Sequence, residues 1–119
     1  MIVDDEPDIR RLVSFSLKRH GLEVIEANDG LSACAMAETE KPDLILMDVM
    51  MPIMNGFEAS RRIKENPATA GIPIVMLSAK SQTYEQEQGL QTGAIQYITK
   101  PFTPAELVGQ VTSHLSGKG

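Results

Sequence analysis

The sequence contains a single cysteine, Cys34, and lacks any long hydrophobic run. One thiol cannot close a disulfide within the chain, so the composition fits a reducing compartment. No apolar stretch approaches the roughly 18 residues that a membrane-spanning helix needs, and Met1 does not open a signal peptide. We therefore expect a soluble protein of the cytoplasm that does not enter a membrane.

Basic residues are also in short supply, because 11 Lys and Arg stand against 16 Asp and Glu, a formal charge of −5. Binding to nucleic-acid phosphates requires a surplus of positive charge, so nucleic acid is not expected as the direct partner. The acidic surplus leaves room for divalent cations wherever carboxylates gather.

The length and composition predict one folded domain. A chain of 119 residues is long enough for one domain but not for two. Its 42% hydrophobic and 23% charged residues are ordinary for a globular protein. We expect the domain to span residues 1–116, with residues 117–119 as a linker or terminal tail.

Short apolar runs alternate with longer amphipathic stretches. The apolar runs predict strands at residues 1–3, 22–27, 44–47, 74–77 and 95–98. The amphipathic stretches predict helices at residues 7–20, 30–38, 56–65, 84–91 and 104–115. A strand followed by a helix, repeated along the whole chain, is typical of an α/β fold with a parallel sheet and helices on both faces.

The first predicted helix, residues 7–20, has a basic side. Four cations lie largely opposite its apolar face: Arg10, Arg11, Lys18 and Arg19. Phe15 falls on the flank between the two faces. It either folds back onto the core or offers an apolar anchor to a partner helix.

Polar residues stand where the predicted strands end. Asp4 and Asp5 follow the first strand, Asp48 the third and Ser78 the fourth, and Lys100 is near the end of the fifth. In open α/β sheets, ligands bind beyond the carboxyl ends of the strands. We therefore expect these groups to meet in one crevice.

Three carboxylates close together repel one another unless a cation offsets them. Lys100 can supply one positive charge, and Mg²⁺, which prefers oxygen ligands, can supply more. A carboxylate beside Mg²⁺, with an ammonium and a hydroxyl in reach, suits phosphoryl transfer onto that carboxylate. Each residue also has an ordinary explanation, as a helix cap (Asp4, Asp5), a loop acid (Asp48), a turn residue (Ser78) or a solvated charge (Lys100).

Four motifs in register resemble the response-regulator receiver domain of two-component signalling. They are V-D-D-E at residues 3–6, L-M-D-V-M-M-P-I-M-N-G at 46–56, M-L-S-A at 76–79 and Y-I-T-K-P-F at 97–102. The resemblance covers the whole chain. It implies a doubly wound, flavodoxin-like (βα)5 three-layer sandwich whose five-stranded parallel sheet has the strand order 2-1-3-4-5. Receivers usually carry several residues before the first motif, whereas only Met1 and Ile2 precede it here.

The resemblance also implies the roles of the acidic residues. Asp48 matches the aspartate that accepts a phosphoryl group. Asp5 matches a direct ligand of Mg²⁺, and Asp4 beside it is expected to act through water. Met50 matches the position whose backbone carbonyl binds the ion, a contact for which the side chain does not matter.

The remaining motif residues match the groups that hold and report the phosphoryl group. Ser78 matches the Ser/Thr that engages it, Lys100 matches the lysine that pairs with it, and Tyr97 matches the aromatic switch residue. The implied partners are a sensor histidine kinase or phosphotransfer protein and a downstream effector domain or protein. A phosphorylation-dependent dimer is compatible with the family. The chain is expected to catalyse only its own phosphorylation and dephosphorylation, not turnover of a substrate.

Three other functions fit the sequence less well. A phosphatase that forms an aspartyl phosphate typically needs a second acid two residues after its nucleophile, where this chain has Met50. A flavin-binding module needs a Ser/Thr/Gly-rich phosphate loop, whereas residues 5–8 are D-E-P-D. A degenerate receiver that serves only as a scaffold is disfavoured because the site positions are filled.

Overall fold

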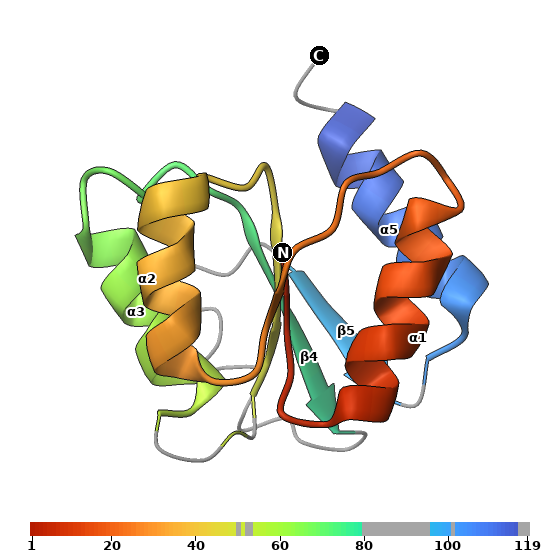
Figure 1. Ribbon diagram of the computed structural model, residues 1–119, viewed down its shortest axis with the longest axis horizontal. Helices are drawn as coiled ribbons and strands as arrows, with labels where there is room; N and C mark the ends of the chain where they lie inside the picture. The colour runs from red at the N-terminus through yellow and green to blue at the C-terminus, as the bar shows by residue number, and fades with distance from the viewer. Residues whose placement is uncertain (50, 52–53, 80–95, 101, 117–119) are drawn as a thin grey trace.

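A parallel sheet forms the centre of the molecule (Figure 1). The computed structural model describes residues 1–49, 51, 54–79, 96–100 and 102–116. Within them the strand order is β2-β1-β3-β4-β5. The strands are β1 Ile2–Val3, β2 Glu26–Ala27, β3 Ile45–Asp48, β4 Ile74–Ala79 and β5 Gln96–Lys100. The order reverses at β1 and β3, as in a doubly wound sheet, and it confirms the predicted fold class.

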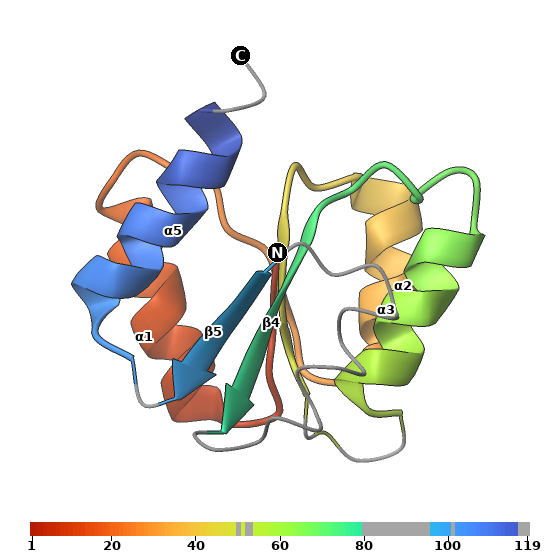
Figure 2. The ribbon, with the colours of Figure 1, turned by 180° about the vertical axis from the view of Figure 1, so that it is seen from behind.

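Helices cover both faces of the sheet. Helices α1 (Pro7–Lys18) and α5 (Pro104–Ser116) lie on one face, and α2 (Gly30–Glu40) and α3 (Gly56–Glu65) lie on the other (Figures 1 and 2). Of the helices in the described ranges, none combines the length and the apolar character needed to cross a bilayer.

Successive residues of the central strands supply the two apolar layers. Leu46 and Val75 pack with the apolar residues of α1 and α5, whereas their chain neighbours Met47 and Met76 pack with those of α2 and α3. All four side chains are at most 1% exposed. Because side chains alternate between the faces of a strand, burial on both faces needs an unbroken apolar run. This is the pattern that the sequence shows.

Two polar caps set the beginnings of α2 and α3. The amide of Ser32 donates to Asp29 Oδ1 at 2.7 Å, and the amide of Glu58 donates to Asn55 Oδ1 at 3.0 Å. Each bond satisfies a backbone donor that the first helical turn leaves without a partner. Helix α3 therefore begins at Gly56, a few residues after the end of β3 at Asp48.

The observed bounds correct the predicted ones in the first half of the chain. Strand β2 covers only the last two residues of the predicted strand 22–27, although the amide of Ile2 still bonds to the carbonyl of Ile25 at 2.9 Å. Helix α1 ends at Lys18 instead of residue 20, because the chain reverses at Gly21, whose φ is +82°. The predicted helix at residues 84–91 lies outside the described residues.

Strands β3, β4 and β5 run further than the apolar runs predicted. Asp48 and Lys100 are the last residues of β3 and β5, and Ser78 lies inside β4 instead of after it. The ladder pairs Ser78 with Thr99 and Ala79 with Lys100. Backbone groups make these bonds, so a polar side chain does not end the strand.

Candidate functional site

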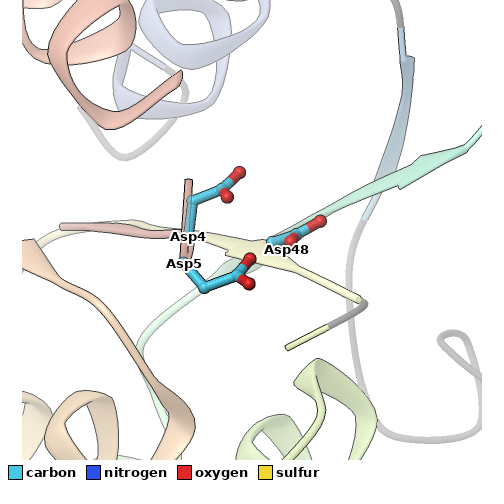
Figure 3. Close-up of side chains that lie close together, drawn as sticks. All are labelled: Asp4, Asp5 and Asp48. Carbon is cyan, nitrogen blue, oxygen red and sulfur yellow. The ribbon is translucent and has the colours of Figure 1, made fainter. Parts of the chain in front are cut away.

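Three carboxylates gather at the carboxyl ends of β1 and β3 (Figure 3). Asp4 and Asp5 directly follow β1, and Asp48 ends the neighbouring strand β3, whose Met47 pairs with Val3. One carboxylate oxygen from each residue lies within 4.8 Å of the other two. Asp4 is 0% and Asp48 4% exposed, whereas Asp5 is exposed. The structure thus brings together the three acids that the sequence placed at strand ends.

Backbone groups hold Asp4 in place. Its amide donates to the carbonyl of Ala27 at 3.2 Å, and its Oδ1 accepts from the amide of Glu6 at 2.9 Å. Oδ1 thereby closes a side-chain turn that directs the chain into α1. The ordinary explanation of Asp4 as a residue that helps to start the helix is therefore partly right, but it does not account for Asp5 and Asp48.

Gly56 lets the beginning of α3 pack against the end of β3. Its amide donates to the carbonyl of Val49 at 2.8 Å. A Cβ atom added at Gly56 would lie 2.2 Å from the carbonyl oxygen of Asp48. Only glycine fits this approach of two backbones. In the sequence, Gly56 stands out only as the last residue of a motif, and nothing there indicates this close approach.

Ser78 and Lys100 reach the same edge of the sheet. Leu77 pairs with Asp48, so the next residue of β4, Ser78, lies one step beyond that pair. Lys100 pairs with Ala79, and Tyr97 pairs with Met76 deeper in the sheet. The side chains of Ser78, Tyr97 and Lys100, and the whole of Met50, lie outside what the structure describes. Their predicted contacts therefore stay predictions.

The donor set fits a hard divalent cation. All three groups offer carboxylate oxygens, the ligands that Mg²⁺ and Ca²⁺ prefer. Two of them, Asp4 and Asp48, are buried, so their charges are weakly screened by water and favour a bound positive charge. The site can therefore hold a metal ion next to a carboxylate that could act as a nucleophile.

Arg10 is a part of this region that its predicted place on the basic side of the first helix does not reveal. Its side chain is only 19% exposed and contacts Glu26 at 3.4 Å, and its guanidinium donates to the carbonyl of Asp4 at 2.8 Å. Helical side chains lean toward the helix N-terminus. A long side chain in the first turns of α1 can therefore reach the loop before it, and this was the available signal.

The model of the response regulator receiver domain matches residues 1–112. The chain belongs to this family. This receiver domain has the strand order and the acidic cluster that the resemblance implied. Its class is that of the response regulators of two-component signalling.

Curated relatives of the receiver include transcriptional regulatory proteins. It is 44% identical over 119 residues to the phosphate regulon transcriptional regulatory protein PhoB of Pseudomonas aeruginosa, covering 100% of this chain and 52% of the relative. It is 43% identical over 115 residues to the alkaline phosphatase synthesis transcriptional regulatory protein PhoP of Bacillus subtilis, covering 97% and 47%. The chain thus spans about half the length of these relatives.

Solved structures agree with this assignment. The chemotaxis protein CheY4 of Vibrio cholerae is 35% identical, with a TM-score of 0.88 over 94% of this chain and 93% of that one. A whole solved protein of the family therefore has the size and fold of this receiver.

Proposed function

We propose that the receiver accepts a phosphoryl group on Asp48. The observation that carries the proposal is the near-complete burial of Asp48 within 4.8 Å of Asp4 and Asp5 at the carboxyl edge of the sheet. The donor would be a phosphohistidine of a sensor histidine kinase or a phosphotransfer protein. The phosphorus–nitrogen bond breaks, its electron pair stays on the histidine nitrogen, and a carboxylate oxygen of Asp48 forms the new phosphorus–oxygen bond.

The same cluster would hold Mg²⁺. Asp5, Asp48 and the carbonyl of Met50 are the proposed direct ligands, and Asp4 would act through water. When bound, the ion offsets negative charge on the phosphoryl oxygens. Ser78 would donate a hydrogen bond to one of these oxygens, and Lys100 would pair with another. The positions of both residues at the ends of β4 and β5 support these roles.

The proposed output is a shift between two conformations. Movement of Ser78 toward the phosphoryl group would vacate space that the ring of Tyr97 then fills, which biases an existing equilibrium. Tyr97 and Ser78 lie on adjacent strands, β5 and β4. The altered surface would therefore include β5 and α5.

Exposed apolar residues on α1 are the proposed contact for the phosphodonor protein. Phe15 is 61% and Leu12 40% exposed, so the alternative in which Phe15 folds onto the core is wrong. The guanidinium of Arg19 lies 5.7 Å from the centre of the Phe15 ring, which gives this patch a cationic rim. An apolar patch with basic neighbours suits an amphipathic helix of a partner protein.

The remaining proposals concern the molecular context. We propose a receiver unit over residues 1–116 that works in the cytoplasm. We also propose that it makes no direct contact with nucleic acid, since the formal charge of the 119-residue chain is −5. Because this chain covers about half of the transcriptional regulatory proteins PhoB and PhoP, we propose a downstream effector domain or protein. We also propose a phosphorylation-dependent dimer. The receiver's chemistry would be limited to its own phosphorylation and dephosphorylation.

Phosphorylation with a small donor tests the acceptor. Incubation with acetyl phosphate and Mg²⁺ is expected to add one phosphoryl group to the wild type and none to Asp48→Asn, as measured by intact mass. Asp8→Asn is the matched control, because the Asp8 side chain is 96% exposed, and it should be labelled like the wild type. Stable labelling of Asp48→Asn at another residue would contradict the assignment.

A titration tests the metal ligands. We expect millimolar-grade Mg²⁺ binding, because water supplies the remaining ligands. Binding can be followed by the Mg²⁺-dependent rise in Tm. Asp48→Ala should weaken it strongly, whereas unchanged affinity in that variant would remove Asp48 from the metal site.

A further inference from the structure

We propose that Arg10 is a positioning residue for the acidic cluster, holding the peptide group between Asp4 and Asp5 in the orientation that metal binding needs. This inference rests on the proposed function of the cluster. It assigns a role to a residue outside the cluster, and that role follows from three contacts and one burial value.

Arg10 bridges three parts of the chain. Its Nη1 donates to the backbone carbonyl of Asp4 at 2.8 Å, and its Nε lies 3.4 Å from Glu26 Oε1 on β2. Arg10 itself belongs to α1. The guanidinium therefore ties the first turn of α1 and the start of β2 to the acidic loop. A planar guanidinium with several fixed donors suits such a bridge, which a lysine ammonium cannot reproduce at both acceptors.

The bridge acts on the direction of the Asp5 side chain. The carbonyl of Asp4 and the amide of Asp5 form one planar peptide group. Fixing that carbonyl therefore limits how the backbone turns at Asp5. The amide of Asp4 is already bonded to the carbonyl of Ala27 at 3.2 Å, so Arg10 fixes the opposite side of the residue. Asp5 is exposed and would otherwise sample many orientations.

The burial of Arg10 indicates that its side chain is a structural bridge and not a solvated charge. The Arg10 side chain is 19% exposed, whereas its neighbour Arg11 is 80% exposed. Burying a guanidinium is costly unless acceptors surround it. The carbonyl of Asp4 and the carboxylate of Glu26 are two such acceptors.

Charge and geometry predict opposite effects for the loss of Arg10. A positive charge near a cation site weakens cation binding, so removal of that charge alone would tighten Mg²⁺ binding. Loss of the bridge would instead leave Asp5 poorly oriented, and partners that orient metal ligands typically change affinity by about 10- to 100-fold. Because Glu26 already pairs with the Arg10 charge, we expect geometry to dominate.

The test compares Mg²⁺ affinity in four variants of the 119-residue chain. Arg10→Gln should bind Mg²⁺ about 10-fold more weakly than wild type. Arg10→Lys keeps the charge but reaches one acceptor, and it should fall between the two. Glu26→Gln keeps a neutral acceptor and should have a smaller effect than Arg10→Lys. Arg61→Gln is the control, since Arg61 is 57% exposed and pairs with Glu58 on α3, and it should match the wild type.

Two further readouts separate positioning from general stability. If Arg10 only stabilised the fold, Arg10→Gln would lower the free energy of unfolding without Mg²⁺ and would leave the Mg²⁺ affinity of the folded protein unchanged. Positioning predicts that Arg10→Gln needs more Mg²⁺ for half-maximal phosphorylation by acetyl phosphate and regains nearly the wild-type rate at saturation.

The outcomes distinguish this inference from the proposed function. Unchanged or tighter Mg²⁺ binding by Arg10→Gln would overturn the role of Arg10 while leaving the cluster as the metal site. An Arg10→Lys variant that equals the wild type would overturn the two-acceptor bridge. A wild type that neither binds Mg²⁺ nor becomes phosphorylated would overturn both proposals.

Discussion

The two ends of the sheet differ in packing and in chemistry. At the carboxyl ends of β1 and β3, charged groups are buried and backbones touch, with Gly56 against the carbonyl of Asp48. At the amino ends, a cavity of about 540 Å³ opens between the sheet and helices α1 and α5. Its apolar lining includes Leu17, Leu22 and Leu115.

This contrast shows close backbone packing at Gly56 and open space at the opposite end of the sheet. The carboxyl end of the sheet holds three carboxylates close together. Such like charges oppose folding, and their proximity is expected of a functional site. Among the described residues, no such carboxylate cluster lies at the amino end. There the terminal amine of Met1 donates to the carbonyl of Leu44 at 2.7 Å. Four substitutions or titrations can sharpen or break this comparison.

The largest effect on stability is expected at the carboxyl end of the sheet, from Gly56→Ala. The new Cβ would lie 2.2 Å from the carbonyl oxygen of Asp48, so backbone must move, at a cost of about 3 kcal/mol or more in the free energy of unfolding. Gly109→Ala is the control, because a Cβ there meets nothing within 4 Å. In helix α5 it should stabilise by about 0.5–1 kcal/mol. Equal effects of the two changes in urea denaturation would contradict the close approach.

The second prediction concerns the pH dependence of stability and the Met1 amine at the amino end of the sheet. Burial lowers the pKa of the Met1 amine from 8.0 to about 6, an effect that Asp43 partly opposes. Above pH 8 the amine is neutral in both states. Between pH 8 and 6 the unfolded chain takes up the proton first, so stability falls as pH falls. The free energy of unfolding should therefore be about 2–3 kcal/mol higher at pH 8.5 than at pH 5.5.

The control for the pH effect is the same chain acetylated at its amino terminus. The acetyl group removes the titrating amine, and the adjacent cavity, which Met1 itself lines, has room for it. The remaining pH dependence then comes from other groups. Identical pH profiles for the acetylated and unmodified chains would show that the amine does not titrate on folding.

A smaller effect is expected from Asp5→Asn. The carboxylates lie within 4.8 Å of one another, so removing one charge should stabilise the Mg²⁺-free protein by about 1 kcal/mol. The same change should abolish the further stabilisation that Mg²⁺ provides. Asp8→Asn, which removes an exposed acid paired with Arg11 at 3.8 Å, should change stability by less than about 0.5 kcal/mol. A destabilised Asp5→Asn protein would mean that repulsion in the cluster is already offset.

The smallest effect is expected inside the cavity, from Val111→Ile. Val111 lines the cavity, and one additional buried methylene should stabilise the protein by about 0.5–1 kcal/mol. Val75→Ile is the matched control, because Val75 is 0% exposed in the middle of β4 and does not line the cavity. That change should cost about 1–3 kcal/mol through overpacking. Thermal unfolding of both variants decides whether the two regions differ in available space.

Much of the fold was predictable from the apolar runs and from the residues that typically end helices and strands. The runs at residues 44–47 and 74–77 became β3 and β4 because strands buried on both faces need continuous apolar sequence. The ends of strands were less predictable. Ser78 was expected after its strand and lies inside it, because ladder bonds do not depend on side-chain polarity.

The candidate site was predictable as a set of residues but not as a geometry. Asp4, Asp5 and Asp48 could be named because parallel strands bring their carboxyl ends to one edge. Arg10 could not, since helical periodicity gives a side chain's face and says little about how far a long guanidinium bends toward a neighbouring loop. The cavity at the opposite end was equally hidden, because no local pattern records space between elements.

The sequence by itself determined the α/β class, the membership of the receiver family and the identity of the acids, because these depend on local periodicity and on motifs contiguous along the chain. Only the tertiary structure decided the burial of Asp4 and Asp48 and the bridge from Arg10 to Glu26. These features join residues far apart in the sequence. Their energies come from desolvation and close packing, which exist only once the sheet and its helices have assembled.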